Sequence, residues 1–256
     1  MSGWSGTGDA YAVSYAALCA GTGAQLRELA GAPLGRSLLD VGSGDGRLAG
    51  EWQDAGWQVT ACEPEPSMRA AARRRHPDLV LVDGMLPTLP FEDNAFDVVS
   101  CNFVLNHVPD PRAAARELRR IARDAVIATT WSASPSSFWA EVTARSGLTP
   151  RAGGRLPADK DFERSAAGFE RMLGDAGWHP EVSELTWTWM PSAATLWHSV
   201  EGGVGGAGAF YAALDAASRG LFRAAFDALV AEAGVDGAVP HAQTAAIAID
   251  RRIRET

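Results

Sequence analysis

Residues 38–49, LLDVGSGDGRLA, place three glycines between an apolar run and the start of a helical pattern. Gly42, Gly44 and Gly46 are spaced as G-x-G-x-G, whereas a dinucleotide-binding turn requires G-x-G-x-x-G. Because glycine carries no Cβ, the shorter turn still lets the backbone approach a ligand closely. The stretch therefore predicts a strand, a tight turn and a helix that hold a ligand other than a nicotinamide dinucleotide.

Two carboxylates mark this turn. Asp40 lies two residues before Gly42, and Asp45 lies inside the turn. Acids there are poor neighbours for a pyrophosphate, which requires helix N–H groups and positive charge. They suit a ligand that carries an ammonium or a sulfonium group. Since a glycine-rich turn alone is weak evidence, the interpretation depends on acids further along the chain.

Short apolar runs alternate with amphipathic helical patterns beyond the turn, which predicts an α/β fold with a right-handed, doubly wound sheet. We expect a Rossmann-like seven-stranded sheet with a helical cap inserted before the last strand. The ligand crevice should then lie at the carboxyl ends of the strands. The predicted strands are residues 37–42, 58–63, 79–83, 96–102, 125–131, 181–190 and 244–252.

The chain is predicted to form a single domain over residues 1–256. Residues 7–30 have a helical pattern, and residues 1–30 are interpreted as a lid, followed by a core over 31–191. Residues 192–240 are too long for a hairpin connection and contain a long helical pattern over 210–233, so they are interpreted as a helical cap over the pocket. Residues 241–256 would supply the last strand and a tail.

Acidic side chains also end the second and third predicted strands. Glu63 can accept both hydroxyls of an adenosine ribose, and Asp83 can accept the adenine amino group. Gly84 and Met85 can supply backbone contact and an apolar surface to the ring. Each acid alone would be an ordinary strand-end residue. At successive strand ends of one sheet, however, they favour an adenosine site.

Four motifs, LLDVGSGDGRLA, CEPEPSM, VDGMLPTLPFEDNAFDVVSCNFVLNHVPDP and LGDAGW, together resemble the class I S-adenosylmethionine-dependent methyltransferases over about residues 36–190. The resemblance is greatest to the small-molecule group that includes quinone-biosynthesis C-methyltransferases and bacterial tailoring enzymes. It implies S-adenosyl-L-methionine as the cofactor. The residues YAVSYAALCAGT also resemble the N-terminal helix of these enzymes, which makes Tyr11 and Tyr15 candidates for a lid over the cofactor.

The resemblance also implies a role for each motif position. Those near the methionine part would be Asp40, Gly42, Gly44 and Asn102. Those near the adenosine part would be Glu63, Pro64, Asp83, Gly84 and Met85.

The function that follows is methyl transfer to an O, N or C atom of a small, partly apolar metabolite by in-line displacement. Such a reaction requires alignment and the exclusion of water, and a general base only if the nucleophile must lose a proton. Two alternatives stay open. One is an enzyme that uses the same cofactor for a cyclisation or rearrangement without methyl transfer. The other is a non-catalytic binding protein, against which the three acids argue.

Candidate catalytic and substrate residues follow the fourth and fifth strands and lie in the cap. His107 is the candidate catalytic residue, as a base, a hydrogen-bond partner of the substrate or a structural residue. Trp131, Trp139 and Trp197 are candidate pocket walls, with core packing as the alternative. His198 flanks the cap and is a candidate to reach the substrate. An aromatic wall suits a flat apolar substrate or a cationic one, and the sequence does not decide between them.

The composition excludes several other classes. A net charge of −8 argues against a nucleic-acid partner or an anionic membrane surface, although arginine-rich stretches occur at 69–75 and 112–123. No apolar run is long enough to cross a bilayer, and the start shows no secretory signal, so we expect a cytoplasmic protein. The three cysteines form no CxxC pair and no metal-ligand cluster stands out, so no metal is expected. The oligomeric state is left open.

Overall fold

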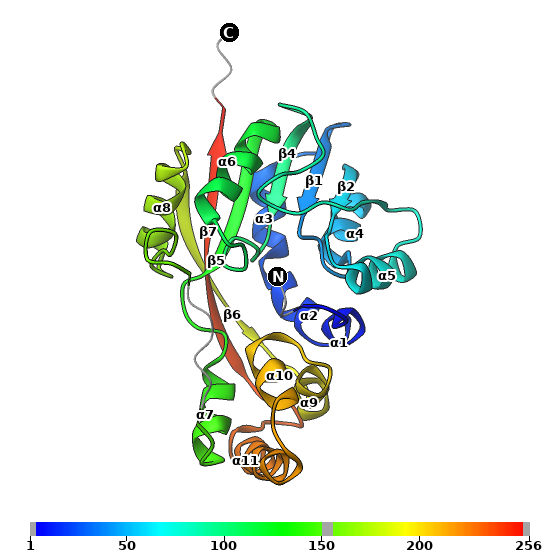
Figure 1. The fold of residues 1–256 in the computed structure, drawn as a ribbon. Helices are drawn as coiled ribbons and strands as arrows, with labels where there is room; N and C mark the ends of the chain where they lie inside the picture. The colour runs from blue at the N-terminus through cyan, green and yellow to red at the C-terminus, as the bar shows by residue number, and fades with distance from the viewer. Residues whose placement is uncertain (1–3, 150–155, 253–256) are drawn as a thin grey trace.

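A computed structural model describes residues 4–149 and 156–252 of the chain. Residues 1–3 of the predicted lid and 253–256 of the predicted tail lie outside the described residues. One seven-stranded sheet, in the order β3-β2-β1-β4-β5-β7-β6, runs through the molecule (Figure 1). Its strands are β1 Ser37–Val41, β2 Gln58–Cys62, β3 Val80–Val82, β4 Phe96–Cys101, β5 Ala122–Trp131, β6 Glu181–Trp189 and β7 His241–Arg251.

Strands β1 to β5 are parallel, whereas β7 pairs antiparallel with both β5 and β6. Successive residues of β1 point to opposite faces of the sheet, as strand geometry requires. Leu39 packs on one face with Leu118 and Phe169, and Leu38 packs on the other with Trp52. Both leucines are fully buried, which explains the near-continuous apolar runs of the sequence. The predicted doubly wound α/β fold is confirmed.

Helices cover both faces of the sheet. Helices α6 (Pro111–Ile121) and α8 (Ala166–Asp175) pack on one face, and α3 (Gly23–Ala30) and α4 (Arg47–Asp54) pack on the other. Helix α5 (Pro66–Arg75) connects β2 to β3. The local sequence sets the start of α6, since the Asp110 carboxylate accepts a hydrogen bond from Ala113 N–H and Pro111 occupies the first helical turn.

A group of helices beyond one end of β5, β6 and β7 forms the cap (Figure 1). Helices α9 (Ala193–Glu201), α10 (Gly205–Ala212) and α11 (Ala216–Ala233) lie between β6 and β7, as predicted. The single helix expected over 210–233 is wrong. Asp215 interrupts it because its carboxylate accepts a hydrogen bond from Ser218 N–H and caps a new helix.

One cap helix was not predicted. Helix α7 (Ser137–Arg145) comes from the connection after β5, yet it packs against the helices inserted before β7. Its Phe138 and Trp139 share an apolar cluster with Trp197, Phe222 and Phe226. The cap is therefore built from two segments that lie far apart in the sequence.

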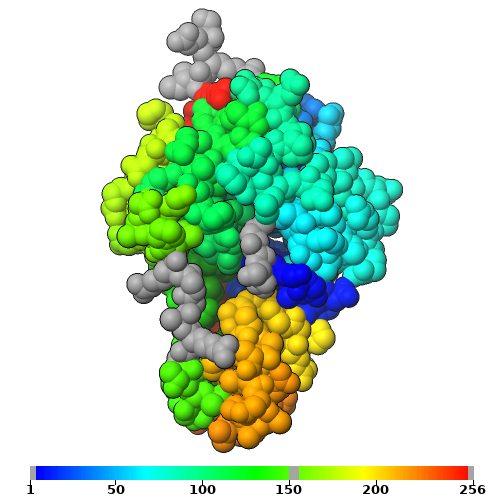
Figure 2. Space-filling view, in the orientation of Figure 1, coloured from blue at the N-terminus to red at the C-terminus, as the bar shows by residue number. Residues whose placement is uncertain are grey.

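The N-terminal segment is broken into short helices: α1 Gly8–Ala12, α2 Tyr15–Cys19 and the 3₁₀ turn η1 Ala20–Thr22, followed by α3. Figure 2 shows this segment between the core and the cap helices. Gly8 N–H donates to the Ser67 hydroxyl of α5 at 3.1 Å. A Cβ at Gly8 would lie 2.3 Å from the Ser67 carbonyl oxygen, so only glycine permits this close approach. Across residues 4–149 and 156–252, we find no helix with the length and apolarity that a bilayer crossing requires.

Candidate functional site

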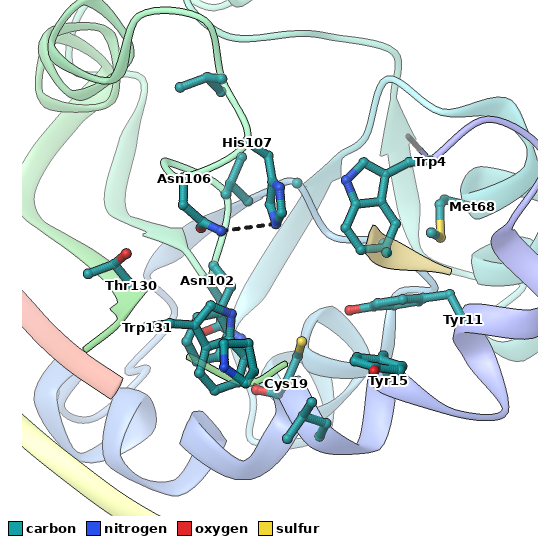
Figure 3. A pocket seen from close by; sticks show the side chains of 18 of the residues that line it. Trp4, Tyr11, Tyr15, Cys19, Met68, Asn102, Asn106, His107, Thr130 and Trp131 are labelled. Atoms are coloured by element: carbon teal, nitrogen blue, oxygen red, sulfur yellow. Dashed lines mark hydrogen bonds between the residues drawn. The ribbon is translucent and has the colours of Figure 1, made fainter. Parts of the chain in front are cut away.

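A cavity of about 680 Å³ lies at the carboxyl ends of the parallel strands, where the strand order reverses between β1 and β4 (Figure 3). Its volume falls in the range of about 300–1,000 Å³ typical of small-molecule sites, and its position is the expected one for this fold. Twelve of the predicted site residues line it: Tyr11, Tyr15, Gly42, Gly44, Glu63, Pro64, Gly84, Met85, Asn102, His107, Trp131 and Trp139.

Four predicted site residues do not line this cavity. Asp40 is buried within β1, and Trp197 is buried in the cap cluster. Asp83 directly follows β3, but its side chain is 70% exposed and its carboxylate binds the Arg69 guanidinium at 2.9 Å. His198 is exposed on α9. The binding roles assigned to these four residues stay predictions.

The glycine turn adopts the conformation that its sequence predicts. Gly42 and Gly44 have φ values of 70° and 57°, in the left-handed region that favours glycine. Side chains close the turn from two sides. A Cβ at Gly42 would lie 2.3 Å from Cγ2 of Val104, and a Cβ at Gly44 would lie 3.1 Å from Cε1 of Tyr11. The turn therefore joins the N-terminal segment to the segment after β4.

Glu63 fastens the turn to the end of β2. Its Oε2 accepts a hydrogen bond from Gly44 N–H at 2.9 Å, and its Oε1 accepts one from Glu65 N–H at 2.9 Å. Burial raises the pKa of Glu63, and the two backbone donors oppose that rise. A carboxylate offers about four lone-pair sites, so each oxygen keeps capacity for a hydroxyl donor. The residue fits a vicinal diol such as that of a ribose.

Asp40 lies behind the turn with its side chain buried. Burial, together with the nearby charge of Glu63, raises the pKa of Asp40 to about 7. A cation placed near this carboxyl would favour its charged form. Since Asp40 does not line the cavity, its role beside a sulfonium or an ammonium group stays a prediction.

Asn102 ties the N-terminal segment to the sheet. Its Oδ1 accepts hydrogen bonds from the hydroxyls of Thr129 on β5, at 2.7 Å, and Thr22, at 2.9 Å. Its Nδ2 donates to the Cys19 carbonyl at 3.0 Å. Three of the side chain's four hydrogen-bonding positions are therefore used within the protein. The sequence predicts a ligand contact here, and the structure adds a positioning role.

An aromatic stack follows β4 and β5 on the cavity wall. The rings of Phe103 and Trp131 are parallel within 9°, with centroids 3.8 Å apart, and Trp187 lies 5.7 Å beyond Trp131. Phe103 has a φ of 56°, which is uncommon for a residue other than glycine. The Thr129 hydroxyl holds it there by accepting a hydrogen bond from Phe103 N–H at 2.8 Å. The stack presents a flat apolar surface beside Asn102.

His107 and Trp4 lie on the cavity wall near Tyr11. The ring of Trp4 meets His107 edge-on at 5.2 Å and Tyr11 edge-on at 5.8 Å (Figure 3). The imidazole has an exposed surface on the cavity, yet the surrounding protein lowers the pKa of His107 to about 4, and the charge of Arg164 contributes. His107 is therefore neutral at pH 7. Its Nε2 lies 3.1 Å from Nδ2 of Asn106.

Sequence reasoning missed several lining residues, because they reach the cavity through long-range packing. Trp4 precedes the first helix, and Arg164 lies in the segment before α8, so neither belongs to a motif. Phe103 and Asn106 lie between Asn102 and His107 of a quoted motif, so that motif could have predicted them. Further missed lining residues are Cys19, Met68 and Thr130. Within the described part of the chain, no three His, Cys, Asp or Glu residues gather as a metal site.

Comparison with known proteins identifies the family. A family model described as a methyltransferase domain matches residues 39–128. A demethylmenaquinone methyltransferase of Beutenbergia cavernae is 31% identical over 165 residues, which cover 58% of this chain and 68% of that protein. The chain belongs to the class I S-adenosylmethionine-dependent methyltransferases. The predicted family is confirmed, and so is its cofactor, S-adenosyl-L-methionine.

Other similar proteins differ in how much of this chain they cover. A demethylmenaquinone methyltransferase of Paenarthrobacter aurescens is 36% identical over 90 residues, so this chain spans just over a third of its length, 36%, and the match covers 35% of this chain. The YcgJ protein of Bacillus subtilis has a TM-score of 0.59 at 16% identity, over 91% of this chain and 99% of that one. The [4+2]-cyclase SpnF has a TM-score of 0.52 at 20% identity, over 93% and 82%. These two structures share the fold.

Proposed function

We propose that this methyltransferase transfers a methyl group from S-adenosylmethionine to a small, planar and partly apolar acceptor. The observation that carries the proposal is one cavity with two unlike ends. The Gly42–Gly44 turn and Glu63 form one end, and the stacked rings of Phe103 and Trp131 form the other. The names of the demethylmenaquinone methyltransferase relatives support a quinone-like ring as the acceptor.

The first end has the groups that the cofactor requires. Glu63 would accept the ribose hydroxyls, Gly84 and Met85 would contact the adenine, and the Gly42–Gly44 backbone would pass close to the methionine part. Asp40 would favour the positive charge from behind the turn. When bound, S-adenosylmethionine supplies a methyl group on a positively charged sulfur that leaves as a neutral thioether.

The protein's contribution is then alignment and exclusion of water. Trp4, Tyr11 and Tyr15 would cover the cofactor, and Asn102 would hold their segment in place. Helix α10 contributes Gly205 and neighbouring residues to the wall, which supports a cap over the acceptor. His107 would contact the acceptor as a neutral imidazole.

The charge distribution supports a small-molecule acceptor over a nucleic acid. The arginine-rich helices α5 and α6 are held by carboxylates of the same chain. Arg69 binds Asp83 at 2.9 Å, and Arg119 binds the buried Asp250 at 2.7 Å. These ion pairs reduce the positive field that a phosphate backbone would need.

The test uses methyl-labelled S-adenosylmethionine and a cell extract separated into small-molecule and macromolecular fractions. We expect label in the small-molecule fraction with the wild type and loss of label with Glu63→Ala. A matched control is Glu184→Ala, which removes an exposed carboxylate of β6. Label in macromolecules would contradict the proposed substrate. No label in either fraction despite cofactor binding would support a cyclisation or rearrangement without methyl transfer.

A further inference from the structure

The lining of the cavity carries charges of both signs at separate places. Among its described lining residues, the carboxylates are Glu63 and Glu65, both at the end of β2. Glu65 is bound to the hydroxyl of Ser67, at 2.9 Å, and to Gly6 N–H, at 3.2 Å. Among the same described lining residues, Arg164 is the only lysine or arginine. Its charge acts on His107, which follows β4.

Arg164 is held in place with donors left over. Its Nη1 donates to Asp161 Oδ1 at 2.7 Å and to the Phe162 carbonyl, and its guanidinium lies 3.8 Å from the centroid of the Phe162 ring. Its Nε and Nη2 make no hydrogen bond to the described residues. A guanidinium fixed on one side in this way can bind an oxyanion through the other side.

Two other residues of the same lining have unpaired polar atoms. Asn106 Oδ1 and Thr130 Oγ1 are buried and have no hydrogen-bond partner among the described residues. Figure 3 shows Asn106 and Thr130 on the side of the cavity away from Tyr11, with His107 between Asn106 and Trp4. Buried polar atoms without a partner require one, and a ligand in the cavity can supply it. The hydroxyl can donate, and so can the amide, whose O and N positions are interchangeable by geometry.

We propose that the acceptor binds as an anion, the deprotonated form of a planar acid, with its oxygen held by Arg164 on the wall that carries His107, Asn106 and Thr130. This inference rests on the proposed function, because the acceptor must share the cavity with the cofactor. It excludes the cationic acceptor that the sequence leaves open, since a cation would be repelled by Arg164 and by the sulfonium.

An anionic acceptor removes the need for a general base. A lone pair of the oxyanion forms the new bond to the methyl carbon while the carbon–sulfur bond breaks and sulfur keeps its electron pair. No proton moves in that step. If the delocalised charge forms the bond at a ring carbon instead, that carbon afterwards loses its proton to water. The low pKa of His107, about 4, agrees with a contact rather than a base.

Three probes of one shape and different charge test the inference: naphthoate, naphthamide and naphthylmethylammonium. Each is titrated calorimetrically into the protein, with and without saturating S-adenosylhomocysteine. We expect naphthoate to bind at least about ten-fold more tightly than naphthamide, as for a charge-assisted hydrogen bond. In Arg164→Gln the preference should fall below about three-fold, and Arg164→Lys should keep part of it.

The matched control is Arg171→Gln, which removes a guanidinium of α8 that binds Glu163 at 2.6 Å outside this cavity, and should keep the full preference. Equal binding of naphthoate and naphthamide, tighter binding of the cation, a preference that survives in Arg164→Gln, or no binding of any probe would each overturn the inference. Failure of S-adenosylhomocysteine to bind the wild type would instead count against the proposed function. The measurements without that ligand keep the two failures separate.

Discussion

The indole Nε1 of Trp139 donates a hydrogen bond to the hydroxyl of Tyr15 at 2.9 Å. Tyr15 belongs to α2 of the N-terminal segment, and Trp139 belongs to α7 of the cap. Trp139 also stacks on Phe226 with ring centroids 5.6 Å apart. Both residues line the cavity, so this bond joins the N-terminal segment to the apolar cluster of the cap.

Tyr15→Phe should destabilise the protein by about 1–3 kcal/mol, because it leaves the buried indole N–H of Trp139 without a partner. Urea unfolding of Tyr15→Phe, Trp139→Phe and the double variant forms a cycle with an expected coupling energy of about 0.5–3 kcal/mol. Tyr211→Phe is the control, because its hydroxyl makes no hydrogen bond within the described ranges. A coupling energy near zero would contradict this prediction.

Asn102→Ala should loosen the N-terminal segment while the sheet stays folded. It removes the acceptor of the Thr22 and Thr129 hydroxyls and the donor to the Cys19 carbonyl. We expect faster hydrogen exchange in residues 11–22 and weaker binding of S-adenosylhomocysteine, because the segment opens locally more often when these hydrogen bonds are lost. Asn102→Asp should also loosen the segment, because it loses the donor and adds a charge near that carbonyl. Unchanged exchange in both variants would rule out the tether.

The sequence was sufficient for the seven strands and for most of the residues that line the cavity around the Gly42–Gly44 turn, because those signals are local. Buried runs such as SLLDVG have the length and apolar content of a strand. Gly42 and Gly44 indicate a turn, because glycine readily adopts a positive φ. Glu63 was predictable because a parallel strand places its last side chain at the ligand edge. Family resemblance added the cofactor.

The residues at the Phe103–Trp131 end of the cavity were harder to predict, because residues that lie far apart in the sequence meet there only in the folded chain. Trp131 and Trp139 were predicted as walls, but α7 was not recognised as a helix. Trp197 is also a tryptophan, yet it packs inside the cap. Arg164 is one arginine among many in the sequence, and only the fold distinguishes it from those that carboxylates hold outside the cavity.

Gly44→Ala and Gly220→Ala should have opposite effects. At Gly44 a side chain would have to adopt a φ of 57° and would lie 3.1 Å from Tyr11, so we expect a loss of about 1–2 kcal/mol and at least ten-fold weaker cofactor binding. Gly220 is exposed inside α11, and a Cβ there would have no neighbouring atom within 4 Å, so alanine should stabilise by about 0.4–1 kcal/mol. Urea unfolding and S-adenosylhomocysteine titration measure both. Equal effects would contradict the assigned turn.

Asp40 should make stability fall as pH rises from about 4 to about 7. The ordinary pKa of an aspartate is 3.8. Burial and the charge of Glu63 raise the pKa of Asp40 to about 7 in the folded protein. Between these values the folded state holds more protons than the unfolded state, so stability decreases with pH. The free energy of unfolding of the wild type minus that of Asp40→Asn should therefore decrease across this window. A flat difference would contradict the raised pKa.

The same carboxyl should distinguish the two cofactor forms. S-adenosylmethionine carries the sulfonium charge that S-adenosylhomocysteine lacks, and a nearby cation favours the Asp40 carboxylate. The ratio of their affinities should therefore shift toward S-adenosylmethionine as pH rises through 7, and the shift should vanish in Asp40→Asn. Calorimetric titration between pH 6 and 8 measures it. A constant ratio in the wild type would place the sulfonium away from Asp40.

His107 should have the opposite dependence on pH. Desolvation by the surrounding protein, and then the charge of Arg164, lowers the pKa of His107 from 6.5 to about 4. Between these values the unfolded state binds the proton that the folded state excludes, so stability is lost as pH falls from about 6.5 to about 4. The free energy of unfolding of the wild type should therefore decrease relative to His107→Gln over that interval, whereas Asp40 contributes a gain that cancels in the comparison.

The imidazole titration gives the sharper measurement, because it follows one ring. In a spectrum correlating its carbon-bound protons with its nitrogens, His107 should remain neutral down to about pH 5, as its pKa of about 4 requires. Arg164→Gln should raise that pKa toward 6.5, whereas Arg171→Gln should leave it unchanged. Binding of naphthoate should also raise it, since a nearby anion favours imidazolium. A ring that titrates near 6.5 in the wild type would show that His107 is solvated, and would reopen its role as a general base.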